Sequence, residues 1–300
     1  MTGVSFVVTV YNKAVFLPAV LGAIFAQEGD FAREFVFIDD GSRDDSVAVM
    51  ERLCAGRADV RIIRQANAGP AKATNAAVKA ATLPWLKIVD GDDVLAPSCT
   101  RTLLDAASRL GARFAVGRTV TNPDVTHVTF PVASAPPAIR KGDLFAECVR
   151  NAPCNLTPTL IDRALYWEVG GADARLFYVI DTALLMRASR GRAVAAVNAL
   201  VAKGPLTAPN RMSADQARML REHNRAMLYL RAENPNLSWR LRRQLLERAF
   251  GRAWKWQHRR RGASMASRWF WLYALAKFGP PSVTAPFLPS TLDAFTEALM

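Results

Sequence analysis

Hydrophobic residues in the first hundred positions fall into two kinds of run that alternate along the chain. Four short runs are rich in β-branched and aromatic residues, as strands buried on both faces are, and they cover about residues 4–10, 34–38, 60–64 and 85–89. Between them, apolar residues recur at helical spacing over about 16–27, 46–55 and 70–81. This order predicts an α/β domain with helices that cross between the strands of a mostly parallel sheet.

Three of the predicted strands end in groups of polar residues, at positions 9–12, 39–42 and 90–93. Doubly wound sheets bind their ligands at the carboxyl ends of the strands, so we expect the three groups to line one site. The glycine-rich loops that hold phosphates in dinucleotide-binding and P-loop proteins do not occur in this sequence. A bound phosphate group would therefore need another counter-charge.

The third group places three carboxylates within four residues, at Asp90, Asp92 and Asp93. Carboxylates this close repel one another and raise each other's pKa. A divalent cation such as Mg²⁺ or Mn²⁺ removes the repulsion, because it binds one or two carboxylates together with phosphate oxygens. A solvated acidic turn is the alternative. The shared sheet edge favours a metal site on Asp92, Asp90 and Asp93.

The first two groups offer contacts for a nucleoside. The ring of Tyr11 has a face on which a base can stack, and Asp39 or Asp40 can accept hydrogen bonds from a base N–H or from ribose hydroxyls. A nucleoside diphosphate would use all three groups if its base lay toward Tyr11 and Asp40 and its metal lay at Asp92.

Four stretches within residues 3–100 resemble, in order and spacing, the successive motifs of glycosyltransferase family 2. They are 4–12, 37–42, 67–75 with its Asn-Ala-Gly and Ala-Thr-Asn, and 89–97 with its Val-Asp-Gly-Asp-Asp and Pro. The resemblance implies a GT-A fold, a nucleotide-sugar donor, a divalent cation and inversion at the anomeric carbon. It places the metal-binding Asp-x-Asp motif on Asp90 and Asp92, and nucleoside contacts on Thr9, Tyr11 and Asp40.

The chain departs from the family pattern in the helix after Asn67. Thr74 stands where the family has an arginine, and Lys72 is about 200° away around a helix, so it is a poor substitute. The expected nucleotide-sugar-binding residues are Thr9, Tyr11, Asp39, Asp40, Asn67, Lys72, Asp90 and Arg211.

The Gly170-Gly171 pair and the stretch 179–187 resemble the family's Gly-Gly loop and the acidic pair that opens the next helix. The match gives Asp181 the position of the catalytic base, with Ile180 in place of the preceding acid. A carboxylate near a helix start can instead be a structural cap. Arg211 falls where the family has a loop over the diphosphate, and it is either a phosphate-binding cation or a surface arginine.

The net charge of +13 is concentrated near the end of the chain, since residues 215–300 hold 15 basic and 6 acidic side chains. Residues 239–277 combine basic side chains with five tryptophans, a pattern typical of helices at an anionic membrane surface. Helices packed on the rest of the protein with a solvated basic face are the alternative. Nucleic acid is not expected as a partner, because no reader motif is present.

These features divide the chain into two predicted domains. Residues 1–214 form a GT-A-like domain, with a nucleotide-binding half at 1–98 and an acceptor half at 99–214 that contains a helix near 100–110 and a strand near 113–116. Residues 215–300 form a basic helical region.

We expect a cytoplasmic enzyme, peripheral on the membrane, that is an inverting, metal-dependent glycosyltransferase of bacterial surface polysaccharide synthesis, with a glycan or lipid-linked acceptor. A non-catalytic nucleotide-binding domain with a membrane- or polyanion-binding tail is the alternative. The four cysteines form no Cys-x-x-Cys pair, which indicates thiols in a reducing compartment.

Overall fold

The computed structural model describes residues 2–131, 137–142, 144–151, 155–207 and 215–295. The chain divides into two compact units. The first, called the sheet unit below, comprises Met1–Leu144, Cys154–Ala174 and Arg187–Pro209. The second, called the helical unit, comprises Phe145–Pro153, Arg175–Met186 and Asn210–Met300. The boundary that we expected after residue 214 stays a prediction.

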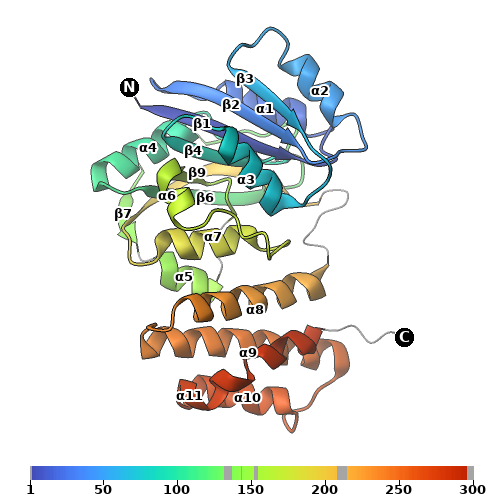
Figure 1. The fold of residues 1–300 in the computed structure, drawn as a ribbon, viewed down its shortest axis with the longest axis vertical. Helices are drawn as coiled ribbons and strands as arrows, with labels where there is room; N and C mark the ends of the chain where they lie inside the picture. Colours follow the sequence, from blue (N-terminus) through green and yellow to red (C-terminus); the bar gives the residue numbers. More distant parts are fainter. Residues whose placement is uncertain (1, 132–136, 143, 152–154, 208–214, 296–300) are drawn as a thin grey trace. The chain divides into compact units, whose positions relative to one another are not determined.

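In the described residues, nine strands form one sheet in the sheet unit (Figure 1). Their order is β3-β2-β1-β4-β8-β6-β9-β5, and β7 pairs with β9. The strands are β1 Gly3–Val10, β2 Ala32–Asp39, β3 Val60–Arg64, β4 Trp85–Asp90, β5 Val94–Leu95, β6 Phe114–Asn122, β7 Ile139–Gly142, β8 Thr159–Asp162 and β9 Val194–Pro205. Strands β1 to β4 are mutually parallel, as are β6 and β9, whereas β8 runs antiparallel to β4 and β6.

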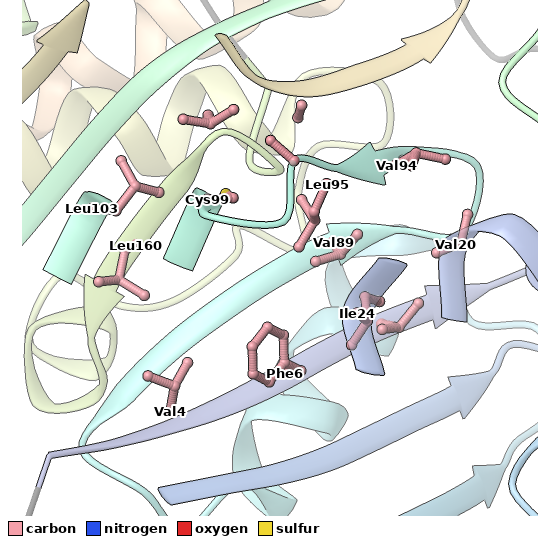
Figure 2. Close-up of a cluster of buried hydrophobic side chains, with 14 of the residues drawn as sticks. Val4, Phe6, Val20, Ile24, Val89, Val94, Leu95, Cys99, Leu103 and Leu160 are labelled. Atoms are coloured by element: carbon pink, nitrogen blue, oxygen red, sulfur yellow. The ribbon is translucent and has the colours of Figure 1, made fainter. Parts of the chain in front are cut away.

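Helices cover both faces of this sheet, which explains the unbroken apolar runs of its central strands. They are α1 Leu17–Phe25, α2 Ser46–Leu53, α3 Pro70–Ala80, α4 Cys99–Leu110 and α6 Arg163–Glu168. Figure 2 shows Phe6 of β1 and Val89 of β4 packed with Ile24 of α1 and Leu103 of α4. Val7 is equally buried but points to the opposite face, where α3 contacts β1 and β2.

Register brings the three expected polar groups to one edge of the sheet. Thr9 of β1 pairs with Ile38 of β2 on one side and with Asp90 of β4 on the other, and Val10 pairs with Asp39. Because the three strands are parallel and end at the same level, the residues that follow them emerge side by side.

The helical unit is built mainly from α8 Gln216–Glu233, α9 Trp239–Arg261 and α10 Arg268–Phe278. The side chains of Asp215, Ser238 and Ser267 cap the amino ends of these helices, and Gly262 closes α9 in a left-handed conformation. The remaining helical segments are α5 Leu144–Asn151, α7 Ile180–Ser189, which continues into the sheet unit, α11 Pro281–Thr284, η2 Ala285–Phe287 and η3 Pro289–Phe295.

The apolar stripe of α9 is buried inside the helical unit. Leu245, Ala249 and Phe250 lie on this stripe, and α9 contacts α8, α10 and η3. Of the two interpretations of this helix, the structure therefore favours packing over insertion of the stripe into a membrane. Across the described residues, every helix is too short or too polar to cross a bilayer.

Candidate functional site

The loop after β1 is fastened to the loop after β2, and this holds Tyr11 at the surface. Ser42 Oγ accepts a hydrogen bond from Asn12 N at 3.0 Å, and Asn12 Oδ1 accepts one from Arg43 N at 2.8 Å. Asn12 adopts a φ of 53°, in the left-handed region that asparagine tolerates better than most residues. The ring of Tyr11 is 42% exposed, so one of its faces is available for stacking.

The two carboxylates after β2 are buried and already bonded to backbone. Asp40 accepts hydrogen bonds from Gln65 Nε2 at 2.7 Å, Ala68 N at 2.8 Å and Gly69 N at 3.0 Å. A carboxylate has about four lone-pair sites, so Asp40 keeps about one for a ligand. Asp39 accepts from the backbone N–H of Ser42 at 3.2 Å. Both residues shape the loops, and their contact with a nucleoside stays a prediction.

Gly41 is required where these loops approach each other. Its φ is +77°, and a Cβ built on it would lie 2.8 Å from the backbone nitrogen of Asn67. The Gly41-Ser42 turn and the loop before α3 are therefore in direct contact, with exposed Asn67 at the rim.

Asp92 is half-buried and forms an ion pair with Lys13 Nζ. Lys13 was not among the residues that we expected at the site. The signal for it is its place directly after the first polar group, since a long side chain there reaches the neighbouring strand end. Lys13 is therefore a candidate for the counter-charge that a bound phosphate group would need.

Asp93, by contrast, is buried against β9. Its carboxylate accepts a hydrogen bond from Asn155 Nδ2 at 3.0 Å, and a Cβ on Gly204 would lie 2.3 Å from its Oδ1. Burial, and then the charge of Asp92, raise the pKa of Asp93 to about 7. At neutral pH a large fraction of Asp93 is therefore protonated.

A buried lysine lies close to the acidic group. Lys87 of β4 has no exposed surface, and its Nζ donates hydrogen bonds to the carbonyl oxygens of Thr157 and Thr159. Burial lowers the pKa of Lys87, while the charges of Cys99, Asp93 and Asp90 act in the opposite direction. The acids at this edge therefore have two lysines near them, buried Lys87 and partly exposed Lys13.

The donor set at this edge fits a divalent cation that is completed by a ligand. Among the residues that the structure describes, no three His, Cys, Asp or Glu side chains are placed to hold a metal ion. Mg²⁺ needs only one or two protein carboxylates when phosphate oxygens and water fill its other positions. Half-buried Asp90 and Asp92 suit that role, and the assignment of Asp90, Asp92 and Asp93 as metal ligands stays a prediction.

Helix α3 anchors the Gly-Gly loop through Asn75. Asn75 Oδ1 accepts hydrogen bonds from Tyr166 Oη at 2.6 Å and Ala172 N at 3.0 Å, while its Nδ2 donates to Ala172 O at 2.8 Å. A Cβ on Gly171, whose φ is +66°, would lie 2.6 Å from Asn75 Oδ1. The neighbouring Thr74 donates to Pro70 O inside its own helix, and Lys72 is exposed.

Replacing Asn75 by alanine is expected to lower the free energy of unfolding by about 1–3 kcal/mol. The reason is that the hydroxyl of Tyr166, which is fully buried, would lose its acceptor, and the carbonyl oxygen of Ala172 would lose its donor. Urea unfolding measures the change, and Lys72→Ala on the same helix is the control, with an expected change within about 0.5 kcal/mol. Equal midpoints for the two variants would contradict the anchoring role.

Asp181 belongs to the helical unit and lies in the first turn of α7, one residue after Ile180 begins the helix. It accepts a hydrogen bond from Thr182 N at 2.6 Å, and burial raises its pKa to about 6. A carboxylate with that pKa is ionised at pH 7 and still a useful base. Arg211 lies outside the described residues.

Glu222 of α8 holds the chain that leads into α7. Its carboxylate accepts hydrogen bonds from the backbone N–H groups of Phe177 at 2.8 Å and Tyr178 at 2.6 Å. Glu222 is buried, and its place about forty residues from these partners left no signal in the sequence pattern. It is therefore a positioning residue for the segment that carries Asp181.

The sequence is similar to bacterial proteins named as glycosyltransferases or as proteins of polysaccharide biosynthesis. ExoO, a succinoglycan biosynthesis protein of Rhizobium meliloti (strain 1021), is 36% identical over 114 residues, which are 38% of this chain and 32% of the relative. EpsJ, an uncharacterized glycosyltransferase of Bacillus subtilis (strain 168), is 31% identical over 107 residues, 35% of this chain and 30% of the relative. Each match thus spans about a third of the relative's length.

Solved structures share the fold over nearly the whole chain. Residues 1–349 of S. aureus TarS superpose with a TM-score of 0.65 at 15% identity, covering 98% of this chain and 89% of that one. The complex of that protein with UDP-GlcNAc gives a TM-score of 0.64. The comparison confirms the expected GT-A fold. The family model Glycosyl transferase family 2 matches residues 5–170, more than half of the sequence. The chain therefore belongs to glycosyl transferase family 2.

Proposed function

We propose that this chain transfers a sugar, with inversion, from a nucleoside-diphosphate sugar to a glycan or lipid-linked acceptor in bacterial surface polysaccharide synthesis. The observation that carries the proposal is the meeting of three strand ends, with exposed Tyr11, the Asp40 loop and Asp92 at one sheet edge. The name of ExoO, which refers to succinoglycan, supports the substrate class, and the UDP-GlcNAc complex of TarS supports the donor class.

In this proposal the sheet unit holds the donor. The base stacks on the ring of Tyr11. The hydroxyl of Thr9 donates or accepts a hydrogen bond at the nucleoside, and the remaining lone pair of Asp40 accepts one. Lys13 lies beside the diphosphate. Asp92 and Asp90 are the residues that would hold a divalent cation, which when bound neutralises the charge of the diphosphate leaving group.

Asp181 is the proposed base. Its carboxylate takes the proton of the acceptor hydroxyl while that oxygen bonds to the anomeric carbon. The bond from this carbon to the diphosphate breaks on the opposite face, so the configuration inverts. The pKa of about 6 keeps Asp181 ionised at neutral pH.

The experiment that tests the proposal has two steps. Thermal shift with a panel of nucleotide sugars, with and without Mn²⁺, identifies the donor, because a ligand that binds the native state raises the Tm. Release of nucleoside diphosphate from that donor then measures turnover. A chain that binds the donor but never releases diphosphate, with any acceptor glycan offered, would be the non-catalytic module that Thr74 and Ile180 leave open.

We also propose that the helical unit attaches the protein to the inner, anionic face of the cell membrane through α10. Trp271, Leu275 and Phe278 are 58%, 42% and 80% exposed, and their i, i+4, i+7 spacing places them on one face of the helix. Lys277 and Arg268 lie on the same helix and favour anionic lipid. Most of α10 lies within the stretch 239–277 that we expected at an anionic membrane surface, and in this proposal α10 takes that role while the apolar stripe of α9 is buried.

The double substitution Trp271→Ser, Phe278→Ser is expected to weaken binding to anionic vesicles by at least about tenfold, because each large apolar side chain contributes about 1.5–3 kcal/mol when it leaves water. Co-sedimentation measures the partitioning. Val15→Ser, an exposed apolar position in the sheet unit, is the control. If the double variant sediments as the control does, α10 is not the attachment face.

A further inference from the structure

The helical unit contains a cavity of about 660 Å³ whose lining is strongly basic. Residues of α8 and α9 form its walls, together with Tyr273 of α10. The residues that matter for its chemistry are Arg248, Arg252, Lys255, Arg259, Trp256 and Tyr273. This volume lies in the range of small-molecule sites, and every lining residue belongs to the helical unit.

Among the described residues that line this cavity, five are basic (Arg248, Arg252, Lys255, Arg259 and Arg260) and one, Glu247, is acidic. In the described part of the chain, no ion pair joins Arg248, Arg252 or Lys255 to a carboxylate. Arg252 Nη1 donates a long hydrogen bond, 3.4 Å, to Asn224 Oδ1. Arg248 Nε is buried and has no hydrogen-bond partner. Buried N–H groups of arginine normally have hydrogen-bond acceptors. The unpartnered Arg248 Nε and the long hydrogen bond of Arg252 therefore indicate that an acceptor is missing.

Electrostatics at the cavity agree with this geometry. Burial and the charge of Arg248 lower the pKa of Arg252, and burial and Arg252 lower the pKa of His223 to about 4. His223 is therefore neutral at pH 7 and adds no charge. Arg248 and Arg252 are both partly buried on the same helix, and two like charges held close together favour the binding of an anion between them.

We propose that this cavity binds a phosphate-bearing ligand through Arg248 and Arg252. Arginine donates in a planar fork that matches two oxygens of a phosphate group, and two arginines with Lys255 and Arg259 nearby suit a dianion or diphosphate. The volume leaves room for a group attached to the phosphate, beside the rings of Trp256 and Tyr273. The site is independent of the proposed donor site, which lies in the sheet unit.

The ligand can be a soluble phosphate compound or the phosphate head group of a lipid, since both present the same chemistry. The first arm of the test is calorimetry of the full chain with inorganic pyrophosphate in EDTA, so that no metal-dependent donor site contributes. We expect Arg252→Gln and Arg248→Gln each to weaken binding by at least about tenfold, the effect of losing a charge-assisted hydrogen bond. Arg240→Gln, an exposed arginine of α9 outside the cavity, should bind as wild type does.

The second arm replaces pyrophosphate with vesicles that contain phosphatidic acid, measured against phosphatidylcholine vesicles. All three variants lose one charge, so they share any non-specific loss, and an additional loss in the two cavity variants identifies a lipid phosphate. The additional loss in either arm supports the site and identifies its source. If wild type binds neither probe, or if the cavity variants bind both probes as Arg240→Gln does, the cavity is not a phosphate site.

Discussion

Replacing Asp92 by asparagine is expected to abolish metal-dependent binding of the nucleotide sugar and to leave the fold intact. Asp92 is only half-buried, whereas Asp93 is buried with Asn155. An amide carries no charge, so it neutralises a divalent cation poorly and leaves the diphosphate with its full negative charge. Asparagine can still accept a hydrogen bond from Lys13, which preserves the contact between the two strand ends.

Calorimetry of donor binding with and without Mn²⁺ measures this effect, and far-UV circular dichroism checks the fold. Asp105→Asn, an exposed acid on α4 at the same charge change, is the control and should bind as wild type does. Equal affinities of the Asp92 variant and wild type in Mn²⁺ would remove the cation from this site. A loss of affinity that also occurs in EDTA would instead assign Asp92 to the donor itself.

The nucleotide-binding half could be predicted from the sequence because its signals are local. The central strands β1 and β4 are mostly apolar and buried, the edge strand β3 is a shorter apolar run with exposed arginines, and each crossing helix carries its own apolar stripe. The parallel order then follows from the handedness of the crossovers, and it brings Thr9, Ile38 and Asp90 level with one another.

The second half of the sheet could not be predicted in the same way. Strand β9 has four alanines among its twelve residues, a composition that favours helix when it is isolated. It is a strand because β6, β5 and β7 pair with it. Strand β8 is only four residues long, and its antiparallel pairing with β4 depends on partners some seventy residues away.

The tertiary contacts that position and charge the side chains of the candidate site could not be predicted from the sequence either. Asn155 fixes Asp93, and Lys87 lies buried below it in what the pattern presents as an ordinary strand. Glu222, on a helix that we assigned to the basic tail, holds the segment before Asp181. Sequence spacing cannot show such pairs, because a hydrogen bond between distant residues leaves no periodicity. The motifs identify which residues carry charge, and the tertiary contacts decide which of them are ionised.

The difference between having an acidic side chain and being ionised has its largest consequence at Asp181. As a half-buried acid with a pKa of about 6, it is ionised at pH 7 at the expense of stability, since burial disfavours the charged form. The protonated form of Asp181 contributes to the free energy of unfolding. This contribution is fully present below pH about 3.8 and is lost as pH rises through about 6. We therefore expect Asp181→Asn to melt at pH 7 no lower than wild type, which is the behaviour of a residue kept for function and not for folding.

The same substitution is expected to reduce sugar transfer by at least about 10²-fold while donor affinity stays close to that of wild type, because general-base assistance is lost but the sheet unit is unchanged. The pH profile makes the test specific. In wild type, kcat/KM should fall about tenfold per pH unit below pH 6, as Asp181 takes up a proton, and in Asp181→Asn this dependence should disappear. Asp92→Asn, by contrast, should lose binding and transfer together. If Asp181→Asn transfers sugar at the wild-type rate with the wild-type pH profile, its carboxylate only stabilises the first turn of α7 through Thr182 N, and another residue takes the proton from the acceptor.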